Sequence, residues 1–163
     1  MNIVFDKLPE TLEEFQALPQ LDLTVPENTC ALFLAALNLY VKNREDGIVA
    51  INILRGPRPM SNMEIQFIRD RLMDKTYLPL AYFEGATPAN NYTPDVPYMV
   101  SVSDDPRPND IVEPGYIRRY VRTTGADSPR AIMLRKKGTE WFLWEYPAVV
   151  MGIRVPACDD PWA

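Results

Sequence analysis

The sequence contains no histidine, and this absence removes several common chemistries. Ser-His-Asp and Cys-His nucleophilic sites need an imidazole base, and nearly all catalytic zinc sites use histidine ligands. The seven glycines are scattered and form neither a G-x-G-x-x-G nor a P-loop pattern, so no phosphate cradle is indicated. The residues therefore point to no cofactor, no metal ion and no catalytic residue.

Cysteine and long apolar runs are also scarce. Two cysteines, Cys30 and Cys158, are too few for a disulfide framework and are typical of a reducing compartment. No apolar run reaches the roughly 20 residues needed to cross a bilayer. The first residues, MNIVFDKLPETLEEF, lack the basic and then apolar order of a signal peptide. We therefore expect a cytoplasmic protein without membrane association.

What is present fits one soluble domain spanning residues 1–163. The chain is 47% hydrophobic and 24% charged, which is ordinary for a globular protein. Its sixteen prolines are spread along the chain, so they separate elements and do not form a repetitive tract. The net charge of −5 argues against general nucleic-acid binding. The charge is uneven, however, because residues 116–137 hold seven bases and a single acid, Asp127.

The first half of the chain favours helices over residues 8–18, 24–43 and 61–75. Each segment has a serine or threonine followed three residues later by glutamate, which is the spacing of a capping box. These pairs are Thr11 with Glu14, Thr24 with Glu27, and Ser61 with Glu64. In residues 24–43, apolar side chains recur at intervals of three and four, which predicts an amphipathic helix.

Residues 47–55 fit two structures. Their β-branched side chains favour a strand. Asp46 as a cap and Gly56 as a stop favour a helix, which we prefer.

The second half favours strands. Residues 78–108 are rich in proline and turn formers, which predicts a long ordered loop with one strand at 98–103. From Gly115 the apolar residues alternate, which predicts strands at 116–124, 130–136 and 140–146. We therefore predict an α+β fold in which N-terminal helices pack against a C-terminal antiparallel meander of three or four strands.

Two loops carry the most polar chemistry. They read GATPANNYTP at residues 85–94 and GADSPR at residues 125–130. A loop bonded to itself is one interpretation, because asparagine and aspartate side chains readily bond nearby backbone. A rim that binds a ligand or partner is the other. The residues that we expect to form such a site are Asn90, Asn91, Tyr92, Asp127, Ser128, Arg130 and Trp141.

Three hypotheses for the function follow. The first, which we prefer, is a non-catalytic module that binds a protein partner or a small anionic ligand. The second is a histidine-free enzyme that uses Asp or Glu with Tyr and Arg in a pocket. The third is single-stranded nucleic-acid binding through the basic, aromatic strands, which the acidity of the whole chain disfavours.

Several blocks of the chain also resemble a known family. They are GPRPMSNMEIQFIRDR, YFEGATPANNYTP, GADSPRAIMLRKKGTEWFLWE and the terminal DPWA. Together they are similar to a family of small bacterial proteins described as a domain of unknown function, from about residue 30 to the end. The resemblance implies a bacterial, intracellular, stand-alone domain and brings no activity, cofactor or site residue with it.

Overall fold

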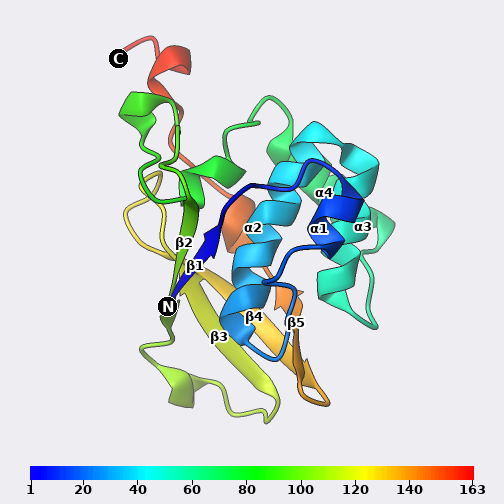
Figure 1. The fold of residues 1–163 in the computed structure, drawn as a ribbon. Coiled ribbons are helices and arrows are strands. Elements are labelled where there is room, and N and C mark those ends of the chain that lie inside the picture. Colours follow the sequence, from blue (N-terminus) through cyan, green and yellow to red (C-terminus); the bar gives the residue numbers. More distant parts are fainter.

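The computed structural model describes residues 1–163 and contains one five-stranded antiparallel sheet with helices on one face (Figure 1). The strand order follows the sequence, β1-β2-β3-β4-β5. The strands are β1 (Asn2–Phe5), β2 (Tyr98–Asp104), β3 (Tyr116–Val121), β4 (Arg130–Lys137) and β5 (Glu140–Glu145). The predicted α+β class is therefore confirmed.

The number of strands and their order along the chain differ from the prediction. The sheet has five strands instead of three or four, and the chain begins with a strand instead of a helix. In β1, Ile3 and Phe5 are buried while Asn2 and Val4 are exposed. Two buried residues in a four-residue stretch are too short a pattern to identify a strand from sequence. The strand forms because β2, more than ninety residues later, supplies its partner.

All four α-helices lie in the connection between β1 and β2. They are α1 (Leu12–Gln16), α2 (Pro26–Lys42), α3 (Arg44–Arg55) and α4 (Asn62–Leu72). Five short 3-10 turns follow: η1 (Pro79–Tyr82), η2 (Pro88–Asn90), η3 (Pro108–Asp110), η4 (Pro147–Val150) and η5 (Ala157–Asp159). No helix combines the length and the apolarity that a membrane span requires.

The predicted helix caps are partly confirmed. Thr11 and Ser61 accept hydrogen bonds from backbone N–H groups three residues on, which is the N-cap half of each predicted box; the reciprocal bond from the glutamate side chain does not form. The box predicted at Thr24 is wrong, because α2 begins after Val25 without a side-chain cap and the Thr24 hydroxyl donates to Asp22. Pro26 in the first turn replaces the missing cap, since its fixed φ suits a helix start.

Residues 47–55 are helical, as preferred, and belong to α3. The helix begins earlier than expected, with Asn43 as its cap in place of Asp46. The Asp46 carboxylate instead accepts the backbone N–H of Leu12, at 2.9 Å, and so ties α1 to α3.

The core is built around α2, which lies across the inner face of the sheet (Figure 1). Every residue of α2 from Thr29 to Tyr40 is buried, including positions outside the predicted apolar stripe. The sheet covers one side of α2, while α3 and η1 cover others. The inner face of the sheet supplies Val100, Val102, Val121, Ile132, Leu134 and Leu143. A helix enclosed on several sides needs no polar face, which explains the apolar run ALFLAAL.

The close approach of α2 and α3 gives a prediction about Gly47. A Cβ atom added at Gly47 would lie 2.2 Å from the Cα of Tyr40. Alanine normally stabilises a helix interior by about 1 kcal/mol relative to glycine. At Gly47 the clash reverses that sign, because α2 and α3 must separate. We expect Gly47→Ala to lower the free energy of unfolding by about 1–3 kcal/mol, measured by urea denaturation.

Val49→Ala is the matched control for Gly47→Ala. Val49 lies two residues further along α3 and is exposed. We expect Val49→Ala to change stability by less than about 0.5 kcal/mol. A Gly47→Ala protein as stable as the parent would contradict the packing of α2 against α3.

Candidate functional site

The two polar loops singled out in the sequence lie at one end of the sheet, where they hold the C-terminal tail, residues 151–163. Asn90 is used within its own loop. Its side-chain oxygen accepts the N–H groups of Thr87 and Thr93, at 2.9 and 3.0 Å, and its amide donates to the carbonyl of Gly85, at 2.7 Å. Asn91 adopts left-handed backbone and accepts the N–H of Cys158 at 2.8 Å. One asparagine therefore shapes the loop and the other binds the tail.

Tyr92 extends the contact with the tail. Its ring is buried, stacks on Tyr77 at 5.5 Å between centroids, and its hydroxyl donates to the carbonyl of Arg154 at 2.7 Å. Burial raises the pKa of Tyr92, nearby Tyr77 raises it further, and Arg154 opposes both. The guanidinium of Arg154 in turn pairs with the carboxylate of Asp127.

Arg130 is the clamp that the GADSPR loop supplies. Its guanidinium donates to the carbonyls of Ala148, Met151 and Gly152, at 2.7, 2.8 and 3.0 Å. Ser128, two residues earlier, is exposed and makes no hydrogen bond. The unusual composition of this loop is accounted for by the tail, since Asp127 and Arg130 each hold a part of it.

Trp141 lies away from these loops. It pairs with Lys136, which is six residues along β4 from Arg130 and therefore about 20 Å distant. The Lys136 ammonium lies 5.5 Å from the centroid of the Trp141 ring. The structure thus brings together the six loop residues and leaves Trp141 at the opposite end of the sheet. That the six bind a ligand stays a prediction.

The role of Arg130 in holding the tail can be tested by measuring hydrogen exchange in the tail. We expect Arg130→Met to increase amide hydrogen exchange in residues 147–158 by about tenfold or more, because three carbonyls lose their donor. Hydrogen-exchange mass spectrometry resolves this segment from the core. Ser128→Ala is the control and should leave exchange unchanged. Equal exchange in both variants would show that Arg130 does not hold the tail.

A second group of side chains surrounds Trp144, at the other end of the molecule. A hollow of about 320 Å³, here called the Trp144 hollow, opens between the α3–α4 turn and the β4–β5 hairpin. Its nine lining residues are Arg55, Pro57, Arg58, Arg135, Lys136, Lys137, Phe142, Leu143 and Trp144. Five of them are cationic and none is acidic, so the hollow is suited to an anion.

Close packing at Gly56 positions the turn that forms one wall. Gly56 ends α3 with φ of +64°, and a Cβ atom there would lie 2.5 Å from the ring of Phe142. The turn therefore sits directly against β5, and it carries Arg58 over the Trp144 ring, 4.7 Å from the centroid. From β4, Arg135 lies 4.7 Å from the same centroid. Both guanidinium groups are thus placed by one aromatic ring.

Arg55 differs from the other cations because its side chain is buried and makes an ion pair and hydrogen bonds. Its Nη2 pairs with Glu64 at 2.8 Å, and its Nη1 donates to the carbonyl of Trp144 at 2.7 Å. Its Nε is buried without an acceptor. The Tyr146 hydroxyl also donates to Glu64, at 3.2 Å. Burial raises the pKa of Tyr146, and Glu64 raises it further against the opposing charge of Arg55.

The other four cations carry no acidic partner. Arg58, Arg135, Lys136 and Lys137 are absent from every ion pair in the molecule. The ring of Tyr116 adds an aromatic wall behind Arg135, whose guanidinium lies 5.1 Å from its centroid.

Removing Arg55 should cost stability. We expect Arg55→Met to lower the free energy of unfolding by about 3 kcal/mol, because Glu64 and two carbonyls of β5 lose their donor in a buried place. Arg58→Met, an exposed arginine three residues away, should cost less than about 0.5 kcal/mol. Urea denaturation of both variants measures the difference, and equal losses would contradict the role assigned to Arg55.

Sequence reasoning missed the Trp144 hollow. The expected site residues lie on the two polar loops and at Trp141, and none of them lines this hollow. Leu143 is buried, whereas Trp144 points to the other face and is only half-buried. The available signal was the alternation itself, which places Arg135 and Trp144 on the outer face. The contribution of Arg58 came from a turn nearly eighty residues earlier, which no local pattern reveals.

Three further observations concern metal ligands and similarity to known proteins. No group of three or more carboxylate or thiol side chains is placed to hold a metal ion. Residues 7–157 match the family described as "Domain of unknown function (DUF6935)", and the chain therefore belongs to that family. Neither a curated protein nor a solved structure matches the chain.

Proposed function

We propose that the protein is a non-catalytic binding module and that the Trp144 hollow holds an anionic group, a carboxylate or a phosphate, of its ligand. The observation that carries the proposal is the gathering of four unpaired cations around one hollow, in a chain whose net charge is −5. Unpaired like charges repel one another, so an anion at their centre would relieve a cost that the free protein bears.

The geometry of the two arginines favours such binding. A guanidinium presents a planar fork of donors that matches a carboxylate or phosphate. Stacking on Trp144 restricts the side chains of Arg58 and Arg135 before a ligand arrives. Less side-chain entropy is then lost on binding. The volume of about 320 Å³ is at the small end of the range for ligand pockets and suits a small group.

The two other hypotheses find less support. An enzymatic pocket without histidine needs a carboxylate, and none lines the Trp144 hollow; Asp110, Glu113, Tyr116 and Arg118 line a separate hollow of about 450 Å³ beside it. Nucleic-acid binding through the basic, aromatic strands needs free cations. On β3, Arg118 pairs with Asp105 at 3.0 Å, and Arg119 lies 3.7 Å from Glu27. These pairs neutralise part of the charge on which the nucleic-acid hypothesis depends.

Anion binding can be measured with pyrophosphate and citrate as probes. In a protein with Trp141→Phe and Trp162→Phe, Trp144 is the remaining indole and its fluorescence reports on the hollow. We expect a saturable change with a dissociation constant on the order of micromolar to millimolar. The affinity should fall as salt rises, because the attraction is electrostatic.

Charge-matched variants separate the hollow from the rest of the surface. The double variant Arg58→Gln with Arg135→Gln should weaken binding by about tenfold or more, measured by calorimetry. Arg44→Gln with Arg69→Gln removes the same charge from exposed positions outside the hollow and should leave the affinity unchanged. Equal weakening by both pairs, or no saturable binding of either probe, would overturn the proposal.

A further inference from the structure

The tail carries acidic and aromatic side chains that the body of the protein leaves largely uncovered. Trp162 is 92% exposed, more than any other large hydrophobic side chain. Asp159 is also exposed. Beyond Cys158, the hydrogen bonds of the tail are internal: Asp160 accepts the N–H of Trp162 through its carboxylate, at 2.8 Å, and that of Ala163 through its carbonyl. The tail therefore presents a short, folded, acidic segment with an indole ring at its side.

A second hollow next to the first is suited to an indole ring. It measures about 340 Å³ and has Met63, Phe67 and Pro147 among its lining residues. Trp144 lines both hollows, so the cationic one and the apolar one share a wall. Met63 is 82% exposed here, which leaves an apolar surface without a partner in the single chain.

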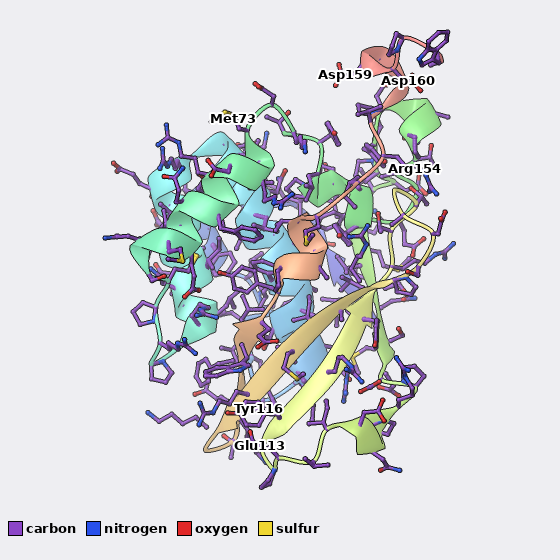
Figure 2. The ribbon with its side chains drawn as sticks, turned by 180° about the vertical axis from the view of Figure 1, so that it is seen from behind. Met73, Glu113, Tyr116, Arg154, Asp159 and Asp160 are labelled. Atoms are coloured by element: carbon purple, nitrogen blue, oxygen red, sulfur yellow. The ribbon has the colours of Figure 1, made fainter.

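A ligand that fills both hollows would carry an anionic group and an apolar group, such as an aromatic ring, a short distance apart. Asp160 and Trp162 are two residues apart, a span of at most about 7 Å. The tail therefore has the chemistry that the surface around Trp144 requires. It cannot reach its own hollow, because the two lie at opposite ends of the molecule. Figure 2 shows Asp159 and Asp160 at one end and Tyr116 at the other, and Tyr116 is 5.7 Å from Trp144 between ring centroids.

We propose that the Trp144 hollow receives the tail of a second copy of this chain. Asp159 and Asp160 face the cations of the first hollow, and Trp162 enters the apolar hollow beside it. The inference rests on the proposed function and names its ligand. The contact is heterologous, because one copy supplies the tail and the other supplies the hollow. The acidic tail and the cationic lining of the Trp144 hollow are opposite in charge, which favours this order over contact between like surfaces.

Charge reversal tests the contact by complementation. One variant, Arg58→Glu with Arg135→Glu, keeps an intact tail and loses the hollow. The other, Asp159→Lys with Asp160→Lys, keeps the hollow and loses the tail. Sedimentation velocity at low salt should show the parent protein increasing in mass with concentration and each variant alone remaining monomeric. An equimolar mixture of the two variants should form a heterodimer, because one intact tail meets one intact hollow.

A peptide measurement avoids dependence on the folding of the variants. A fluorescein-labelled peptide of residues 156–163, with serine in place of Cys158, is titrated with the parent protein and followed by anisotropy. We expect saturable binding. Replacing both aspartates with asparagine, or Trp162 with alanine, should weaken binding by about tenfold or more. The asparagine peptide is the matched control for charge, since it keeps size and the aromatic ring.

The results distinguish the inference from the function on which it rests. A parent protein that stays monomeric, together with a peptide that does not bind, overturns the inference. If pyrophosphate still binds at Trp144 in that case, the anion-binding function stands and another ligand occupies the hollow. Association of the parent that persists unchanged in both charge-reversal variants places the contact elsewhere and also overturns the inference. Failure of both pyrophosphate and peptide overturns the inference and the proposed function together.

Discussion

The buried guanidinium of Arg55 is the interaction on which the arrangement of helices and sheet depends. It lies at the end of α3, pairs with Glu64 of α4, and donates to two carbonyls on the outer edge of β5. A single side chain thus fixes two helices relative to the sheet and satisfies an edge that would otherwise be open. At the same edge, the carbonyl of Trp141 accepts a hydrogen bond from the Thr29 hydroxyl, and the N–H of Trp141 donates to the carbonyl of Leu23.

The position of Arg55 also affects the geometry of the Trp144 hollow. By fixing the end of α3, it sets the path of the turn that follows, and this turn places Arg58 over Trp144. Because Glu64 neutralises Arg55 and no acid reaches Arg58 or Arg135, the structure separates one structural cation from a set of free ones. In the proposed function, stability and binding would therefore fall to neighbouring arginines with different surroundings.

Sequence patterns predicted the elements better than their contacts. The N-caps Thr11 and Ser61, the helix over residues 47–55 and the strands after Gly115 all follow from local spacing, and all are present. The strand at Asn2–Phe5 could not be predicted, because it depends on a distant partner. The Trp144 hollow depends on the same kind of contact, between a turn after α3 and a hairpin far along the chain.

The core and the tail are stabilised by different interactions, and we therefore expect them to unfold differently. A core of 33 buried residues joins the sheet to the helices, whereas the tail adds only the partly buried Ile153 to it and is otherwise held by hydrogen bonds and an ion pair. Apolar burial is cooperative across the core, but the polar ties of the tail can open one by one. A probe on Trp162 and a probe on the sheet would therefore report different melting curves. The tail would unfold separately from the core, and the whole chain would not unfold in one two-state transition.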